Sequence, residues 1–213
     1  MLGTQGEQGP TWAWAPLGGP VRAIGGRVST GSRALDRKVD EWLGTIKSGG
    51  LQLPSFQRGS AWDTRRVASM LDTILHDLPL GITLVLDVGD EEKFHSRPLE
   101  TAPDTPNKVT EHLLDGQQRL TALWRALKDN NEKVTYFVHV PELDDDPDND
   151  DEYVSIRAVA LWKNATGDRY PKWVSSPVGC LRQGLIPVRL LDPDNDEADS
   201  WVSEATKPLE PGN

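Results

Sequence analysis

The strongest constraint on the fold is a short apolar segment that runs directly into a glycine-containing turn and then into an amphipathic helix. The segment is His112–Leu114, the turn is Asp115-Gly116, and the helix is expected over residues 117–128. Leucines recur at intervals of three to four residues in that helix, which places them on one face. A turn this short fixes the directions of both elements, so we expect the strand to lie in a sheet and the helix to pack near it.

Hydrophobic spacing divides the rest of the chain into short helices and strands. Apolar residues at helical intervals predict helices over 34–48 and 64–78, the second with Asp63 as its N-cap. Runs rich in leucine and β-branched residues predict strands over 51–53, 82–88, 134–140 and 185–191, the second of them buried, and residues 153–156 are expected to pair back onto 134–140. We therefore expect an α+β fold with a small mixed sheet and about three helices.

Charge and composition exclude several classes of protein. The net charge of −10 argues against a simple DNA-coating protein, but eight acidic residues lie within 142–152 and the rest of the chain carries only −2. No apolar run is long enough to span a membrane, and the first residues lack the basic and apolar regions of a secretory signal. A single cysteine, Cys180, allows neither an internal disulfide nor a cysteine-based zinc site, which favours a reducing, cytoplasmic setting.

The turn that opens the 117–128 helix combines the groups that a phosphate site needs. Backbone N–H groups at a helix start attract anions, and Gly116 lets a ligand approach the backbone closely. Arg119 adds a planar fork of donors, and Asp115 is a candidate ligand for Mg²⁺. Gln117 and Gln118 are candidates to position a water or read a base. The competing interpretation is that Asp115 is only the helix N-cap, accepting from the Gln118 N–H.

A second segment offers groups suited to nucleic acid. Pro54 fixes an extended entry, Phe56 and Trp62 provide flat faces, and Gln57 and Arg58 provide a base reader and a phosphate binder. The competing interpretation makes the two aromatic residues core anchors and Arg58 an ordinary loop residue. Cys180 is expected to be a buried, unreactive thiol rather than a redox group. The acidic segment 142–152 lacks the spacing of an EF-hand, so we interpret it as a solvated loop.

Three segments together resemble a known family. LPSFQRGSAW, DTILHDLPLGITLVL and LLDGQQRLTALWRAL look like the N-terminal domain of GmrSD-type modification-dependent restriction endonucleases, over roughly residues 34–140. The resemblance implies a ParB/sulfiredoxin-like fold, which we assign to residues 34–191. Residues 1–33 are then an N-terminal extension, partly flexible, and 192–213 a polar tail where the chain is truncated ahead of a helical region and an HNH-type nuclease domain. No such nuclease signature occurs in the sequence itself.

The resemblance also implies an activity. Family members resemble nucleotide-hydrolysing sensors of modified DNA, and the SspE branch senses phosphorothioate DNA. The implied catalytic residues are Asp115, Gln117, Gln118 and Arg119, with GTP as the favoured nucleotide and Mg²⁺ as the cofactor, held by Asp115. Gly116, Gln57 and Arg58 would bind the nucleotide phosphates. An apolar dent beside cationic donors would suit the sulfur of a phosphorothioate, and Pro54, Phe56 and Trp62 beside Arg58 are the residues expected to form it and contact DNA.

Two other functions remain open at this point. In the first, the same turn holds a DNA phosphate, Arg58 and Arg119 act as clamps, and no nucleotide is turned over. In the second, the chain is an interaction or immunity subunit that recruits a nuclease through exposed tryptophans.

Overall fold

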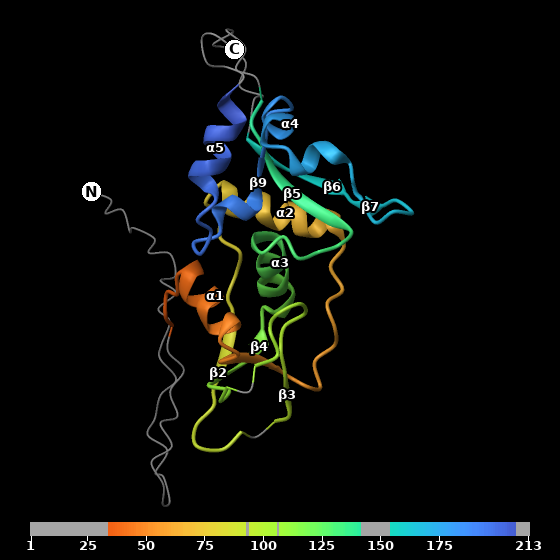
Figure 1. The fold of residues 1–213 in the computed structure, drawn as a ribbon. Coiled ribbons are helices and arrows are strands. Elements are labelled where there is room, and N and C mark those ends of the chain that lie inside the picture. Colours follow the sequence, from red (N-terminus) through yellow and green to blue (C-terminus); the bar gives the residue numbers. More distant parts are fainter. Residues whose placement is uncertain (1–33, 93, 106, 142–153, 208–213) are drawn as a thin grey trace, which may run out of the picture. The chain divides into compact units, whose positions relative to one another are not determined.

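A four-stranded sheet and a three-stranded sheet organise the fold, and a helix follows directly from one strand of the first (Figure 1). The computed structural model describes residues 34–92, 94–105, 107–141 and 154–207. The extension 1–33 and the acidic segment 142–152 lie outside the described residues. Residues 37–213 cluster into one unit, and the following concerns that unit.

The first sheet has the strand order β2-β4-β1-β3. Its strands are β1 (Leu51–Pro54), β2 (Leu84–Asp87), β3 (Ser96–Arg97) and β4 (Glu111–Asp115). The two central strands, β1 and β4, run parallel, whereas β2 and β3 pair antiparallel at the two edges. The expected mixed sheet is therefore confirmed.

The second sheet is antiparallel, with β5 (Val134–His139) between β6 (Ser155–Ala160) and β9 (Leu185–Pro187). The predicted pairing of the chain after the acidic segment onto 134–140 is confirmed. Residues 162–170 form a small hairpin of β7 (Trp162–Lys163) and β8 (Arg169–Tyr170).

Three helices lie where the sequence predicts them: α1 (Val39–Lys47), α2 (Thr64–Leu75) and α3 (Gln117–Leu127). They pack against β1, β4 and β5 around one apolar core that includes Leu53, Leu113 and Trp124. Asp63 caps α2 as expected, because its carboxylate accepts from the Arg66 N–H at 2.8 Å. No helix among these described segments has the length and hydrophobicity needed to cross a bilayer.

The first helix begins later than predicted, at Val39 instead of residue 34. Lys38 is extended, with φ −71° and ψ 159°, and the acidic residues Asp40 and Glu41 fall in the first turn, where they favour the positive end of the helix. The second helix also ends earlier, at Leu75.

The prediction of a buried strand over 82–88 is wrong in its burial. The strand exists as β2, but it is an edge of the sheet, and Leu84 is 51% exposed. The neighbouring Ile82 and Leu86 are exposed as well. Richness in β-branched residues and leucine measures compatibility with a pleated strand and not the coverage of that strand by other elements.

The C-terminal segments also differ from the prediction. The expected strand 185–191 stops at Pro187, which has no N–H for the ladder, and continues as a 3₁₀ turn over Val188–Leu191. The region expected to be a polar tail contains α5 (Ala198–Thr206). Trp201 and Ala205, four residues apart, are both buried in a second core with Phe137, Cys180 and Leu185, beside the short helix α4 (Pro177–Leu181).

Candidate phosphate site

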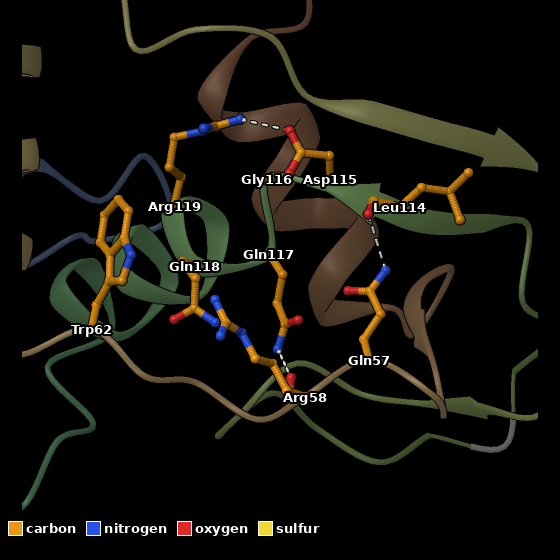
Figure 2. Close-up of a pocket in the computed structure, with 9 residues that line it drawn as sticks. All are labelled: Gln57, Arg58, Trp62, Leu114, Asp115, Gly116, Gln117, Gln118 and Arg119. Carbon is orange, nitrogen blue, oxygen red and sulfur yellow. Dashed lines mark hydrogen bonds and ion pairs between the residues drawn. The ribbon is translucent and has the colours of Figure 1, made fainter.

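A pocket of about 270 Å³ opens at the turn between β4 and α3 (Figure 2). Its walls come from three parts of the chain: the end of β4, the first turn of α3, and the loop after β1. The lining residues are Gln57, Arg58, Trp62, Leu114, Asp115, Gly116, Gln117, Gln118 and Arg119. The structure thus brings together the two segments that the sequence singled out.

Gly116 forms the base of the turn and is the N-cap of α3. Its φ of +94° lies in the left-handed region, and a Cβ built there would lie 3.0 Å from Oγ1 of Thr83. No side chain caps the helix start. The interpretation of Asp115 as an ordinary N-cap is therefore wrong, and the first N–H groups of α3 remain available to a ligand in the pocket.

The Arg119 guanidinium is held in place at the pocket wall. Its Nη2 donates a hydrogen bond to the carbonyl oxygen of Ile82 and lies 3.6 Å from Oδ2 of Asp115. The side chain is only 24% exposed, so it does not extend into bulk solvent. None of the described residues accepts from its Nη1 or Nε, which leaves these N–H donors for an anion.

The three glutamines bind backbone groups across the pocket. Gln57 Nε2 donates to the carbonyl oxygens of Leu113 (2.7 Å) and Leu114 (3.2 Å). Gln117 Nε2 donates to the carbonyl of Arg58 at 2.8 Å. These contacts join the loop after β1 to the end of β4 and the start of α3. They also occupy the amide nitrogens of glutamines that the sequence suggested for positioning a water or reading a base.

Gln118 makes the same kind of contact with the next part of the loop. Its Oε1 accepts from the Ala61 N–H at 2.8 Å, and its Nε2 donates to the Gly59 carbonyl at 3.2 Å. Both ends of one amide are therefore satisfied by the loop, which explains two adjacent glutamines at a helix start without any ligand.

Arg58 is the exposed cation of the pocket. Its backbone carbonyl is fixed by Gln117 and by Arg97 Nη2, which also reaches the carbonyl of Gln57, each at 3.0 Å. Among the described residues no acidic side chain pairs with the Arg58 guanidinium, which projects back toward Gln118 in Figure 2. Sequence reasoning missed Arg97, Ile82 and Thr83, because nothing local marks residues that support a site from another strand.

Pro54 and Phe56 are not brought into this pocket. Pro54 is fully buried at the end of β1. Phe56 is 69% exposed and packs edge-on against Phe94, with ring centroids 5.4 Å apart. Of the residues expected to contact DNA, only Arg58 and Trp62 line the pocket, so the apolar dent proposed from the sequence is not formed there.

Asp115 is the one carboxylate of the pocket lining. It is 72% exposed on its side chain, and within the described residues no group of three or more acidic, histidine or cysteine side chains forms a metal-binding cluster. A single exposed carboxylate fits Mg²⁺ only in the arrangement where substrate phosphates and water supply the remaining ligands, which is a common arrangement for that ion.

Cys180 lies far from this pocket, in the second core. It is 0% exposed, and its Sγ–H lies 3.4 Å from the Trp173 carbonyl. Burial raises the pKa of its thiol to about 11, against the opposing effect of Arg189. The thiol is therefore protonated at neutral pH, as expected for a buried, unreactive cysteine.

Comparison with known proteins identifies the family of the chain. Residues 39–172 match the family described as the GmrSD restriction endonuclease, N-terminal domain. An uncharacterized protein of Methanocaldococcus jannaschii is 28% identical over 115 residues, which cover 47% of this chain and 20% of that protein. The chain thus spans about a fifth of the length of that relative. No solved structure matches the chain.

Since the family match covers well over half of the sequence and includes the whole pocket, the chain belongs to the GmrSD restriction endonuclease N-terminal domain family.

Proposed function

We propose that this chain is the nucleotide-hydrolysing, DNA-sensing part of a restriction protein that acts on modified DNA inside the cell, with phosphorothioate DNA as the favoured target. Membership of a restriction family supports the role with modified DNA. In the full-length protein, a nuclease domain would make the cut. The pocket between β4 and α3 is the proposed nucleotide site.

The observation that carries the proposal is the anchored position of the Arg119 guanidinium at the wall of the pocket. The guanidinium is anchored by one nitrogen to a backbone carbonyl, next to a helix start that no side chain caps. An anchored guanidinium costs less entropy when it binds a phosphate than a mobile one. Uncapped N–H groups, an anchored arginine and an exposed arginine on facing walls make an anion site.

In hydrolysis, only the glutamines would take roles different from those that the sequence suggested. Arg119 and Arg58 would bind the phosphates, and Asp115 would hold Mg²⁺, which neutralises developing charge when bound. Gln57, Gln117 and Gln118 would act as positioning residues, because their amides hold the loop against β4 and α3. GTP remains the favoured nucleotide by family resemblance.

The test is release of inorganic phosphate from GTP by the purified chain, with and without Mg²⁺ and with phosphorothioate or ordinary duplex added. Arg119→Ala is expected to abolish release, and Arg65→Ala, at an exposed arginine on α2, is the control and should leave it unchanged. The proposal fails if wild-type protein releases no phosphate under any of these conditions.

The occupied glutamine amides favour one alternative function, in which the pocket binds a DNA phosphate and hydrolyses nothing. In that case Arg58→Ala and Arg119→Ala would weaken DNA binding, the affinity would fall steeply with salt, and no nucleotide would bind. Modified and unmodified duplexes of one sequence, compared at fixed salt, test the proposed preference for phosphorothioate.

A further inference from the structure

A second pocket, of about 380 Å³, lies beside β1, one of the two central strands of the first sheet. Gln52, Glu92, Phe94, His95, Ser96 and Val109 line it. Gln52 of β1 pairs in register with His112 of β4, and His112 projects from the same face of β4 as Leu114, because side chains alternate along a strand. Leu114 lines the first pocket, so the two pockets are bordered by neighbouring strands, β4 for the first and β1 for the second.

Two lining residues of this second pocket, Glu92 and Ser96, belong to a hydrogen-bonded chain that ends at the buried His112. Nε2 of His112 is 2.6 Å from Oγ of Ser96, and that hydroxyl also contacts Oε1 of Glu92. A carboxylate only accepts and a hydroxyl has one proton, so Ser96 donates to Glu92 and accepts from the Nε2–H of His112. The proton of Ser96 thus points away from the imidazole, which is the wrong direction for a serine nucleophile activated by histidine.

The free acceptors of the pocket define what it can bind. Glu92 is 40% exposed on its side chain and presents its second oxygen, which repels anions and attracts N–H donors. Gln52 is 6% exposed as a residue, its Nε2 reaches the Gly49 carbonyl only at 3.3 Å, and no group among the described residues donates to its Oε1. A ligand must therefore bring hydrogen-bond donors.

An aromatic wall adds a flat surface. The ring of Phe94 is partly exposed and is supported by His112 at 5.7 Å and by Phe56 at 5.4 Å between centroids. Phe56 is followed directly by Gln57 and Arg58, which line the first pocket. Phe56, which supports the aromatic wall of the second pocket, and Arg58, which lines the first, are thus only two residues apart in the chain.

We propose that the second pocket binds a nucleobase with an exocyclic amino group, in the same complex in which the first pocket holds a phosphate. The amino group donates to Glu92, the Gln52 amide pairs with the ring edge, and the ring lies on Phe94. Thymine and uracil have no amino group and would face Glu92 with carbonyl oxygens. The inference rests on the proposed function for its nucleotide ligand, and the base belongs either to the nucleoside triphosphate or to DNA, turned out of the stack.

The first experiment uses nucleosides, which carry no phosphate and so do not depend on the first pocket. The fluorescence of 2-aminopurine riboside is titrated with the full chain and is expected to be quenched. Adenosine and cytidine should displace the probe, whereas thymidine should compete at least about tenfold more weakly, the discrimination expected for one good hydrogen-bonding pair. The proposal is overturned if the probe is not quenched or if thymidine competes as well as adenosine.

Variants locate the binding. Glu92→Gln and Phe94→Ala change partly exposed side chains and should each weaken binding of the probe at least fivefold, whereas Glu91→Gln, at the exposed neighbouring acid, should leave it unchanged. Equal affinities in wild type and Glu92→Gln would overturn the proposal. Circular dichroism spectra that match wild type show that each variant is folded.

The source of the base is separated by two further probes, 2-aminopurine riboside triphosphate and a single-stranded oligonucleotide containing 2-aminopurine. If Glu92→Gln abolishes the quenching of one of these probes, the base site is supported and that probe identifies the source of the base. If the variant still quenches both probes, the base site is contradicted. Arg119→Ala should leave nucleoside binding intact. Binding of nucleosides by a protein that hydrolyses no GTP would refute the proposed hydrolysis and leave the base site standing.

Discussion

The side-chain amide of Gln117 donates a 2.8 Å hydrogen bond to the backbone carbonyl of Arg58, which ties the first residue of α3 to the loop that carries the exposed cation. Gln117 is 8% exposed, so the bond is shielded from water. The two cationic walls of the pocket are therefore held at a fixed separation before any ligand arrives, and this arrangement underlies several of the predictions below.

Replacing Gln117 by glutamate should separate the loop from the helix. A carboxylate cannot donate to the Arg58 carbonyl and would repel it, at a cost of about 1–3 kcal/mol for the unsatisfied group. We expect weaker phosphate binding and a lower unfolding midpoint, measured by calorimetry. Gln183→Glu is the control, because this glutamine also donates to a backbone carbonyl, that of Gly179, but is exposed and does not line the pocket. The same change there should leave phosphate binding intact and lower the midpoint less.

The second prediction concerns Gly116. With φ at +94° and Thr83 Oγ1 3.0 Å from a built Cβ, Gly116→Ala should lower the free energy of unfolding by roughly 1–2 kcal/mol. Gly44 lies in α1 with no heavy atom within 4 Å of a built Cβ, so Gly44→Ala should stabilise the protein by about 0.5–1 kcal/mol. Urea unfolding of the pair measures both changes, and an equal effect at the two glycines would contradict this account of the turn.

The third prediction distinguishes charge from geometry at Arg119. Arg119→Lys keeps the positive charge but loses the planar fork that binds the Ile82 carbonyl and, in the proposed function, would bind a phosphate at the same time. We expect the lysine variant to bind triphosphate about tenfold more weakly, as measured by equilibrium dialysis. Affinity equal to wild type would show that only the charge matters at this position.

The fourth prediction follows from the raised pKa of Cys180. The folded thiol has a pKa of about 11, against 9.0 for a free thiol, so the unfolded chain releases its proton first as the pH rises. The contribution of this group to stability is complete below pH 9 and is lost as the pH rises toward 11. An aromatic disulfide reagent at pH 8 should react with Cys180 only as fast as the protein opens, and rapid reaction in the native state would contradict the burial seen here.

The fifth prediction tests whether α5 belongs to the folded unit. Trp201 is 7% exposed in the second core, so Trp201→Ala should cost about 3–5 kcal/mol. Val202 on the same helix is 54% exposed, and Val202→Ala should change stability by less than about 0.5 kcal/mol. Denaturant unfolding followed by circular dichroism compares the two variants.

The parts of the site that are local in sequence could be predicted. The turn at Gly116 and the position of Arg119 follow from consecutive residues whose spacing and conformational needs are readable, whereas the sequence left open whether Asp115 caps the helix. The loop after β1 was identified by its residue types, and its Arg58 and Trp62 do line the pocket.

The remaining parts depend on pairings between distant strands. Ile82 reaches Arg119 because β2 pairs with β4, and Arg97 reaches the loop because β3 pairs with β1. The burial of Pro54 and the exposure of β2 likewise follow from strand order, which hydrophobic spacing does not encode. The hydrogen bonds of the glutamines could not be predicted for the same reason, since their partners are backbone carbonyls of a loop far away in the chain.

Arg119 is oriented by a main-chain oxygen of residue 82, and a main-chain oxygen is supplied by whichever amino acid stands there. Substitution at position 82 can therefore vary widely without disturbing the direction of the guanidinium. Among relatives of this chain, we expect the arginine to persist while its anchoring residue changes identity freely, so that an alignment would underrate the contribution of the strand that holds it.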